Sequence, residues 1–454
     1  MPHSIRGGFM LLRRATGPIR GRVTPPPSKS ITHRALLAAA LGHGTTVIEN
    51  PLDAQDTRLT AAALSALGAP VSRAEGAWTV TGFRRGAGGL RPAADLDRAA
   101  GTGTVARADG GSDPVTLDLG NSGTSLRFLL PLAALLDRPV VLDGSARLRQ
   151  RPLGAQAAAL RALGAQVDEL GEPGCPPVRV RGPIRSGRVT VDAGGSSQIV
   201  SGLLLAGAAL RGGLMVTASA LSSRPYVDLT LAVMNDFGLA VDVMARDTWS
   251  VAGGCHTENS PRRYRVEADA SAAAFLLAAG VVSGGRVLVE GVGTASPQGD
   301  VAFLDLLARM GCEVTATPST LAAAGPPTSG ITADLNATPD LVPPLAAVAL
   351  LAPGPSRLTG IGHLRVKESD RLAALAREFS RLGGHVTTRK DELLITPLPL
   401  SGAAVSAHGD HRIAMALAIA ALRVPGTGPG DLEMSAVDLD DPACVGKSYP
   451  DFFR

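Results

Sequence analysis

Residues 36–50 read LLAAALGHGTTVIEN, an Ala- and Leu-rich run that a glycine turn separates from a β-branched run. The first run is typical of a buried helix and the second of a strand, because β-branched side chains favour extended backbone. Joins of the same kind recur at residues 128–144, 203–219, 275–291, 346–360 and 415–435. The sequence therefore predicts an α/β fold built from six copies of one unit.

The glycines that end the second helix of each copy indicate the length of the repeat. Successive gaps between them are 96, 74, 73 and 72 residues, so the first gap contains an insertion, the Gly- and Arg-rich stretch from Arg84 to about Pro114. We expect this stretch to be an exposed loop. These glycines are Gly68, Gly164, Gly238, Gly311 and Gly383.

Each copy is βαβαββ in outline and leaves one apolar helix face and one apolar sheet face to bury. Six copies are therefore expected to pack as two domains of three, which agrees with a length of 454 residues. Ligands are expected in the cleft between the domains, where helix N-termini converge.

Composition narrows the class of partner. The net charge is only +4, and aromatic residues make up 3% of the chain, too few to stack nucleic acid bases. The four cysteines are too widely separated for a metal site or a disulfide framework, so we expect reduced, mostly buried thiols. No apolar run is long enough to span a bilayer, and we expect a cytoplasmic protein. The cysteines are Cys175, Cys255, Cys312 and Cys444.

Lysine is nearly absent, and three of the four lysines stand in polar motifs. Lys29 lies in PSKSITHR, Lys367 in VKESDR and Lys447 in GKSYPDFF, whereas Lys390 is predicted to lie in an exposed turn. A compact ammonium can rotate in a pocket and change its protonation, which a guanidinium cannot do. We therefore expect the three lysines in motifs to be functional.

Three polar motifs open Ala- and Leu-rich helices at equivalent places in the repeat. They are PSKSITHR (residues 27–34), GNSGTSLR (residues 120–127) and GSSQIVSG (residues 195–202). Free N–H groups at a helix start attract anions, and Gly123 would allow close approach because it has no Cβ. Each motif is also consistent with an ordinary capped helix, and Arg127 with a structural ion pair.

Further charged motifs fall near the ends of other elements: SARLRQRP (residues 145–152), HLRVKESDR (residues 363–371) and GDHR (residues 409–412). On a helix, Lys367 and Arg371 would share one face with no acid between them. That arrangement is mildly unfavourable unless an anion binds there.

Eight motifs, in order and over nearly the whole chain, resemble those of the 5-enolpyruvylshikimate-3-phosphate synthase family. They are PSKSITHR, LGNSGTSLR, SARLRQRP, SSQ, SRPY, VKESDR, DHR and GKSYPDFF. The resemblance implies two similar domains, each of three βαβαββ units arranged as an inside-out barrel, with the active site in the cleft between them. The boundaries expected here are residues 27–265 for the shikimate-3-phosphate side, and residues 1–26 plus 266–454 for the phosphoenolpyruvate side.

The resemblance also implies the reaction. Members transfer the enolpyruvyl group of phosphoenolpyruvate to the 5-hydroxyl of shikimate 3-phosphate by addition and elimination, releasing phosphate, on the route to chorismate and the aromatic amino acids. Neither a metal nor an organic cofactor is implied. We expect a monomer whose partners are the two small substrates, without nucleic acid or membrane.

Site residues follow from the resemblance position by position. Asp340 would accept the proton of the attacking hydroxyl, and Glu368 would protonate the methylene carbon, with Lys29 as the alternative acid. His363 and Phe128 depart from the family, where many members have Asn and Pro, and Phe128 is expected to alter the start of the helix after Gly123. The residues implied for shikimate 3-phosphate are Lys29, Ser30, Arg34, Ser196, Ser197, Gln198, Ser223, Asp340, His363 and Lys367. Those implied for phosphoenolpyruvate are Lys29, Gly123, Arg147, Gln198, Arg371, Arg412 and Lys447.

The charges of the implied site match those of the substrates. Two phosphoryl groups and two carboxylates bring about six negative charges, and cations in the motifs can balance them. The closest alternative is the related transferase that uses UDP-N-acetylglucosamine, which carries a Cys in the loop that here reads SARLRQRP and usually Asn at Ser30. Two further alternatives are a non-catalytic repeat scaffold that binds anions and an enzyme that acts on the ends of RNA. The cations are Lys29, Arg34, Arg147, Lys367, Arg371, Arg412 and Lys447.

Overall fold

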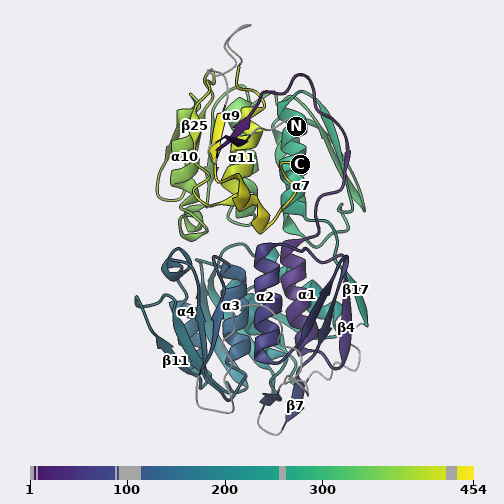
Figure 1. Cartoon of the computed structure of the whole chain (residues 1–454), viewed down its shortest axis with the longest axis vertical. Helices are drawn as coiled ribbons and strands as arrows, with labels where there is room; N and C mark the ends of the chain where they lie inside the picture. Colours follow the sequence, from purple (N-terminus) through teal and green to yellow (C-terminus); the bar gives the residue numbers. More distant parts are fainter. Residues whose placement is uncertain (1–4, 7–8, 87–88, 92–113, 255–261, 426–436) are drawn as a thin grey trace. The chain divides into compact units, whose positions relative to one another are not determined.

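The structure is a computed structural model of the chain (Figure 1) and describes all residues except 1–4, 7–8, 87–88, 92–113, 255–261 and 426–436. The described chain divides into two compact units. Unit 1 comprises the residues up to Pro26 together with Glu267–Arg454, and unit 2 comprises Pro27–Val266. Each unit has its own hydrophobic core.

One sheet topology recurs throughout the described residues, which form six four-stranded sheets, three in each unit, and one two-stranded ribbon. Every four-stranded sheet has one parallel pair, formed by an edge strand and the inner strand next to it. The other two pairs of neighbouring strands in each sheet are antiparallel. This recurrence confirms the prediction of six related βαβαββ units.

Unit 2 contains three sheets with the strand orders β17-β4-β6-β5, β11-β12-β10-β9 and β13-β14-β16-β15. Its helices are α1 (Lys29–Leu41), α2 (Gln55–Leu67), α3 (Gly123–Ala133), α4 (Gly154–Ala162), α5 (Gln198–Gly207) and α6 (Pro225–Asp236), with a 3-10 turn η2 (Leu148–Gln150). Its strands are β4 (Thr45–Glu49), β5 (Val71–Ala74), β6 (Ala77–Thr81), β7 (Arg84–Gly86), β8 (Gly89–Arg91), β9 (Val115–Asp118), β10 (Val140–Asp143), β11 (Gln166–Glu169), β12 (Val178–Arg181), β13 (Gly187–Ala193), β14 (Leu214–Leu221), β15 (Val241–Ala245), β16 (Thr248–Val251) and β17 (Arg263–Arg265).

Unit 1 contains three sheets with the strand orders β19-β20-β18-β3, β21-β22-β24-β23 and β1-β2-β26-β25. Its helices are α7 (Ala270–Val282), α8 (Phe303–Arg309), α9 (Val342–Leu351), α10 (Arg371–Arg381) and α11 (His411–Ala421), with 3-10 turns η4 (Gly299–Ala302), η5 (Pro339–Leu341), η6 (Gly362–Val366) and η7 (Pro442–Lys447). Its strands are β1 (Ile5–Arg6), β2 (Phe9–Leu12), β3 (Arg20–Val23), β18 (Arg286–Glu290), β19 (Glu313–Thr317), β20 (Thr320–Ala324), β21 (Thr332–Asp334), β22 (Ser356–Thr359), β23 (His385–Thr388), β24 (Leu393–Thr396), β25 (Ala404–Val405) and β26 (Val437–Asp440).

The helices supply much of the core of each unit. In α9 every residue from Val342 to Leu350 is buried, as expected for a helix that is apolar on all sides. Figure 1 shows α1, α2 and α3 side by side in unit 2, and contacts join α3 to α5 and α9 to α11. Because the middles of these helices are buried, polar groups that can meet a ligand are confined mainly to their ends.

Two repeats take their first strand from a distant part of the chain. Strand β3 precedes α1 in sequence but pairs parallel with β18, where Arg20 lies opposite Arg286. Conversely, β17 follows β16 but pairs parallel with β4, where Arg263 lies opposite Val47. Each of these strands therefore completes a repeat whose remaining elements lie far away in the sequence, within residues 270–324 for β3 and within residues 29–81 for β17.

Two predictions need correction. The insertion after Arg84 begins with an antiparallel hairpin, β7 with β8, rather than with a loop, while its residues 92–113 lie outside the described part. The thiols are less buried than expected: Cys312 is buried, but Cys175 and Cys444 are half-buried, and Cys255 is outside the described residues. Within the residues described, no helix combines the length and apolar character needed to cross a bilayer.

Candidate functional site

The residues predicted for the site fall into two groups, one in each unit, and most lie at the start of a helix or in a turn just before one. We describe each group separately. The group in unit 2 consists of Lys29, Ser30, Arg34, Gly123, Arg147, Ser196, Ser197, Gln198 and Ser223. The group in unit 1 consists of Asp340, His363, Lys367, Glu368, Arg371, Arg412 and Lys447.

Helix α1 begins at Lys29, as the PSKS motif predicts. The Ser28 side chain caps the helix by accepting a hydrogen bond from the Ile31 N–H. Lys29 is only 9% exposed, and its Nζ lies 3.5 Å from Oδ2 of Asp56 in the first turn of α2. Asp56 is itself buried, so the ammonium is held in a defined place at the positive end of α1.

Arg34 lies one turn further along α1 and is 2% exposed. Its guanidinium donates to Thr230 Oγ1 and to the carbonyl oxygens of Ser30 and Tyr226, each at 2.8 Å. It also stacks 5.1 Å from the centre of the Phe128 ring. Burial lowers the pKa of Arg34 to about 10, which still leaves it charged at neutral pH.

Helix α3 begins at Gly123 with Ser122 as its N-cap. Helix α5 begins at Gln198, whose amide donates to Thr124 Oγ1 at 2.9 Å. Arg127 on α3 donates to the other end of the same amide, Gln198 Oε1, at 3.2 Å. The second and third polar motifs therefore meet directly, and Arg127 orients Gln198.

The predicted serines are buried side chains in turns. Ser196 and Ser197 precede α5 and are 5% and 4% exposed. Ser223 precedes α6 with a left-handed backbone, φ 57°, which is unusual for a residue with a Cβ. Its Oγ is buried without a hydrogen-bond partner among the residues that the structure describes. A hydroxyl placed in this way is suited to a ligand oxygen.

The loop before α4 carries the predicted Arg147, which is half-buried and donates to Gln150 Oε1 at 3.1 Å. Arg149 is exposed and forms an ion pair with Asp143, at 2.6 Å between Nη2 and Oδ2. Arg151, for which no role was predicted, is 3% exposed. Three arginines at alternate positions of one loop therefore have three different environments.

In unit 1, Arg371 opens α10 and is 1% exposed. Its guanidinium contacts Asp410 (Nε to Oδ2, 2.8 Å), Glu368 (Nη2 to Oε2, 2.9 Å) and Asp340 (Nη1 to Oδ1, 3.1 Å). Burial would lower the pKa of Arg371, but the carboxylates, Asp410 first, raise it above its usual value. Arg371 is thus the centre of an ion network drawn from separate segments of unit 1.

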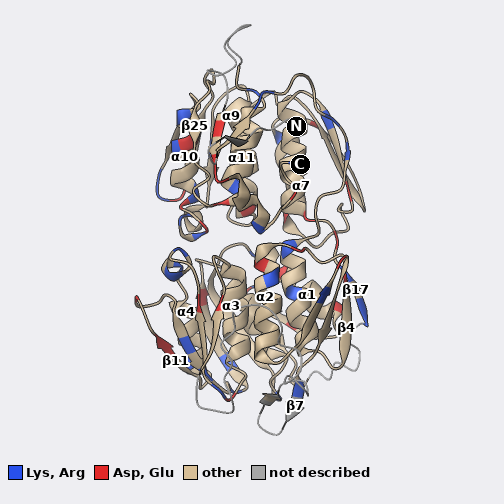
Figure 2. Ribbon diagram, viewed as in Figure 1, with Lys and Arg blue, Asp and Glu red and all other residues tan. Residues whose placement is uncertain are grey.

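Asp340 lies in the short turn η5 before α9 and is held from a second side by Arg412. Arg412 Nη2 lies 2.8 Å from Asp340 Oδ2. Burial would raise the pKa of Asp340, but the nearby cations, Arg412 first and then Arg371, outweigh it and lower the pKa to about 2. Asp340 is therefore a carboxylate and a hydrogen-bond acceptor at neutral pH. In Figure 2 helix α11 is uncharged along most of its length and basic at one end, where Arg412 is its second residue.

Glu368 is shared between two cations, since its Oε1 lies 3.4 Å from Lys447 Nζ and its Oε2 contacts Arg371. Lys447 is 5% exposed and ends the turn η7. His363 lies in η6, and burial, followed by the charge of Lys367, lowers its pKa to about 4. The imidazole is therefore neutral at pH 7, and like the Asn of many family members it can exchange hydrogen bonds without adding charge.

The prediction that Lys367 and Arg371 share a helix face is wrong. Lys367 follows the turn η6 with an extended backbone, and α10 begins only at Arg371. Acids also surround Arg371, whereas we expected no acid between Lys367 and Arg371. The side chain of the N-cap residue Asp370 accepts a hydrogen bond from the Ala373 N–H, so the helix begins directly after Asp370.

Sequence reasoning missed several residues that orient the site. Asp410 is fully buried, caps α11 and holds Arg371, and it is bonded by Ser369 Oγ at 3.0 Å. Asp56 holds Lys29, and Arg127 holds Gln198. Asp410 belongs to the GDHR motif, so the sequence shows an acid before a helix. It does not show the partner of this acid, Arg371, which lies 39 residues away.

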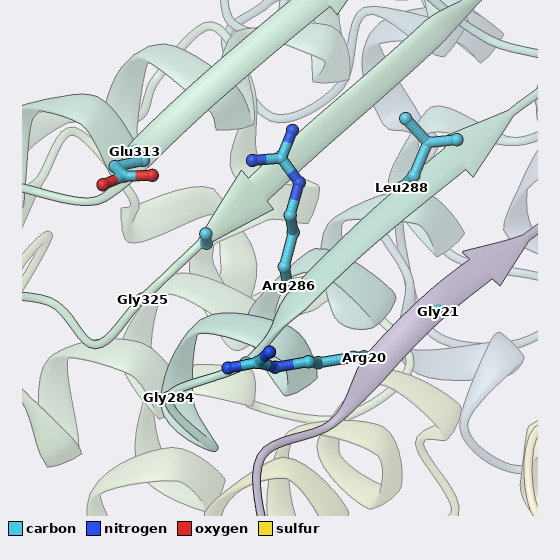
Figure 3. A pocket seen from close by; sticks show the side chains of 9 residues that line it. Arg20, Gly21, Gly284, Arg286, Leu288, Glu313 and Gly325 are labelled. Atoms are coloured by element: carbon cyan, nitrogen blue, oxygen red, sulfur yellow. The ribbon is translucent and has the colours of Figure 1, made fainter.

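A separate hollow of about 410 Å³ lies on the β19-β20-β18-β3 sheet of unit 1 (Figure 3). Arg20 and Arg286 face it from neighbouring strands, together with Glu313. It contains none of the predicted site residues.

Comparison with known proteins gives a consistent result. Residues 13–454 match the family model of EPSP synthase (3-phosphoshikimate 1-carboxyvinyltransferase). The 3-phosphoshikimate 1-carboxyvinyltransferase of Methanoculleus marisnigri is 43% identical over 97% of this chain and 96% of its own length, and that of Halobacterium salinarum is 39% identical over 96% and 95%.

Solved structures agree with the sequence matches. An EPSP synthase from Acinetobacter baumannii superposes with a TM-score of 0.74 at 27% identity, over 97% of this chain and 96% of that one. An enolpyruvyl transferase from Streptomyces tendae, at 21% identity and a TM-score of 0.73, shares the fold. From the family match over almost the whole chain and these full-length relatives, it follows that the chain belongs to the EPSP synthase family, the 3-phosphoshikimate 1-carboxyvinyltransferases of the shikimate pathway.

Proposed function

We propose that the chain transfers the enolpyruvyl group of phosphoenolpyruvate to the 5-hydroxyl of shikimate 3-phosphate and releases phosphate, with the two residue groups acting on the same pair of substrates. The observation that carries this proposal is the network around Arg371. Residues of four separate segments, up to 107 positions apart, converge there: Asp340, Glu368, Arg371, Arg412 and Lys447.

The division of binding roles follows the chemistry of each unit. In unit 2 the donors are hydroxyls, amides and cations, which suit the phosphate and hydroxyl groups of shikimate 3-phosphate. In unit 1 Arg371 and Arg412 already bind carboxylates, so they suit the carboxylate of phosphoenolpyruvate, with Lys447 beside them. We assign residues 27–265 mainly to shikimate 3-phosphate and the rest of the chain mainly to phosphoenolpyruvate. Within residues 27–265, Lys29 and Gln198 are assigned to both substrates. Gly123 and Arg147 are assigned to phosphoenolpyruvate.

Substrate binding would convert Asp340 into a working base. With a pKa of about 2, Asp340 is too weak a base to take a proton from a hydroxyl efficiently. A phosphoenolpyruvate carboxylate on Arg371 and Arg412 would compete for the N–H groups that now bind Asp340, and losing those contacts raises its pKa. The base would then become active when both substrates are present.

The proposed reaction has two steps, addition and elimination. The 5-oxygen of shikimate 3-phosphate bonds to C2 of phosphoenolpyruvate as its proton passes to Asp340, and Glu368 delivers a proton to C3. In the tetrahedral product the C2–O bond to the phosphate then breaks, the departing phosphate takes the proton held by Asp340, and C3 returns its proton to Glu368. Asp340 and Glu368 share contact with Arg371 but differ in their second cation, Arg412 against Lys447, which allows separate proton-transfer roles.

A phosphate-release assay tests the function. Purified protein with both substrates should release one phosphate per turnover, and omission of shikimate 3-phosphate should abolish release. UDP-N-acetylglucosamine in its place should give no release. Release with the sugar nucleotide alone, or none with shikimate 3-phosphate, would overturn the proposal.

The role of Glu368 has its own test. In deuterated solvent with both substrates, the wild type should introduce deuterium into the methylene group of phosphoenolpyruvate, and Glu368→Gln should suppress this at least about a hundredfold. NMR of recovered phosphoenolpyruvate measures the exchange. Normal exchange in Glu368→Gln would transfer the role of carbon acid to Lys29.

We also propose that the enzyme is a cytoplasmic monomer. The support is that both residue groups, with acid, base and cations, are supplied by one chain. Light scattering during activity measurements tests it, and a stable dimer as the active species would contradict it.

A further inference from the structure

Helix α3, which carries part of the candidate site, contains a proline in its last turn, Pro131. Proline has no N–H, so Pro131 cannot donate the helical hydrogen bond to the carbonyl of Arg127, four residues earlier. Arg127 is 2% exposed, and a buried carbonyl that receives no hydrogen bond is unfavourable. A stable α3 therefore needs a donor for this carbonyl from outside the helix.

The side chain of Gln156 in α4 supplies this donor. Its Nε2 donates to the Arg127 carbonyl oxygen at 2.7 Å, and Gln156 is fully buried. The partner settles the orientation of the amide, because a carbonyl can only accept. The Oε1 of the same amide is buried without a hydrogen-bond partner in the part of the chain that the structure describes. An apolar side chain would avoid that cost, so the value of the amide lies in its bond to Arg127.

Helix α5 packs against the same carbonyl through Gly202. A Cβ on Gly202 would overlap the Arg127 carbonyl oxygen and would lie 3.2 Å from both Gln156 Nε2 and the Pro131 ring. Glycine therefore lets α5 lie directly on this hydrogen bond. Three helices, α3, α4 and α5, thus meet at one backbone carbonyl, and the space around it leaves little room for the carbonyl to move.

The residue that owns this carbonyl also orients a side chain of the candidate site. The Arg127 guanidinium donates to Gln198 Oε1 at 3.2 Å and to the Pro152 carbonyl oxygen at 2.9 Å. The Gln198 amide donates in turn to Thr124 Oγ1 at 2.9 Å. A shift of the Arg127 backbone would therefore move the guanidinium relative to Gln198, which is assigned above to both substrates.

We propose that Gln156 is a positioning residue for substrate binding. Its amide replaces the helical hydrogen bond that Pro131 removes, and it thereby fixes Arg127 and, through Arg127, the amide of Gln198. Gln156 acts through Arg127 and is not a catalytic residue. This inference rests on the proposed function, because the substrates of Gln198 are assigned there.

Kinetics of Gln156→Met test the proposal. Methionine is unbranched and similar in length to glutamine but has no N–H, so both KM values should rise at least about fivefold, with kcat changed less than about threefold. Ser283→Ala is the matched control, because Ser283 is buried in unit 1 and donates to the Gly280 carbonyl oxygen of α7 at 2.8 Å. It should leave both KM values within about twofold of the wild type even where it lowers the unfolding temperature. Unchanged KM values in Gln156→Met would overturn the proposal.

Returning the helical N–H provides a rescue test. Pro131→Ala alone should stay close to the wild type, since a carbonyl oxygen can accept from two donors. Gln156→Met combined with Pro131→Ala should then have KM values within about twofold of those of Pro131→Ala alone, because the helix itself now supplies the donor. A double variant in which the full effect of Gln156→Met persists would show that Gln156 does not act through this carbonyl, and would overturn the proposal.

Thermal unfolding of every variant identifies loss of folding. If Gln156→Met does not fold, the double variant decides: folding with KM values near those of the wild type supports the proposal, and failure to fold overturns it. A wild type that releases no phosphate would refute the proposed function, whereas an active wild type matched by Gln156→Met would refute this inference alone.

Discussion

Arg371 in unit 1 and Arg34 in unit 2 are both almost fully buried, at 1% and 2% exposed, but their partners differ in charge. Arg371 binds the carboxylates of Asp340, Glu368 and Asp410. Arg34 is held by a hydroxyl and two backbone carbonyls. Accordingly, the pKa of Arg371 is raised, whereas burial lowers that of Arg34 to about 10.

The difference indicates two ways of preparing a cation for an anionic ligand. Neutral partners position Arg34 and leave its charge uncompensated, so that a ligand anion adds favourable energy directly. Carboxylate partners stabilise buried Arg371, but a ligand carboxylate must displace one of them first. In the proposed mechanism unit 2 is therefore organised for binding, while unit 1 couples binding to the release of Asp340, the proposed base.

The largest expected effect is on stability, in Arg371→Met. Removing this guanidinium leaves Asp410 buried without its strongest partner, and breaking a buried ion pair from one side costs about 3 to 5 kcal/mol. Arg34→Met in unit 2 is the matched comparison and should cost less, about 1 to 3 kcal/mol, because its partners are neutral. Calorimetric unfolding measures both, and equal losses would break the contrast between the units.

Asp340→Asn should lower kcat about a thousandfold, the range for loss of a general base. Because the amide no longer competes as an anion for Arg371 and Arg412, the KM for phosphoenolpyruvate should stay the same or fall. Steady-state kinetics against both substrates check this. A rise in that KM of more than about threefold would mean that Asp340 helps to hold phosphoenolpyruvate rather than excluding it.

The pH dependence of stability sharpens the same point. The pKa of Asp340 is about 2 in the folded protein against the usual 3.8, so its contribution is complete above pH 4 and is lost as the pH falls from about 4 to 2. The contribution is on the order of 2 to 3 kcal/mol. Denaturant unfolding of wild type and Asp340→Asn should therefore differ more at pH 5 than at pH 2. If the difference in stability between wild type and Asp340→Asn does not change with pH, the stabilisation by Asp340 is not ionic.

Lys29→Arg should give the smallest of these effects, a loss of at least about tenfold in kcat/KM, or 1.4 kcal/mol. Lys29 is 9% exposed beside Asp56, where a planar guanidinium is larger than the ammonium it replaces. Lys390→Arg is the control, since Lys390 lies exposed in a bend, as predicted. Retention of more than a tenth of the activity in Lys29→Arg would show that unit 2 needs only a charge at this position.

Local features were predictable because they depend on neighbours in sequence. The joins such as residues 36–50 and the helix starts after Ser28 and Ser122 follow from periodicity and capping. The motifs in order also indicated the family, which the full-length relatives confirm. The structural signals each lie within one short stretch of chain, whereas the family signal is the order of the motifs over nearly the whole chain.

Partners and burial depend instead on segments that meet only in the folded chain. Nothing near Arg371 in sequence identifies Asp410, and nothing in SARLRQRP separates buried Arg151 from exposed Arg149. Strand β3 likewise leaves its neighbour α1 to pair with β18, because parallel pairing places no limit on sequence separation. The sequence by itself thus determined the repeat and the residue types of the site. Tertiary structure decided which charges are paired, because Coulomb energy depends on distance and burial rather than on order along the chain.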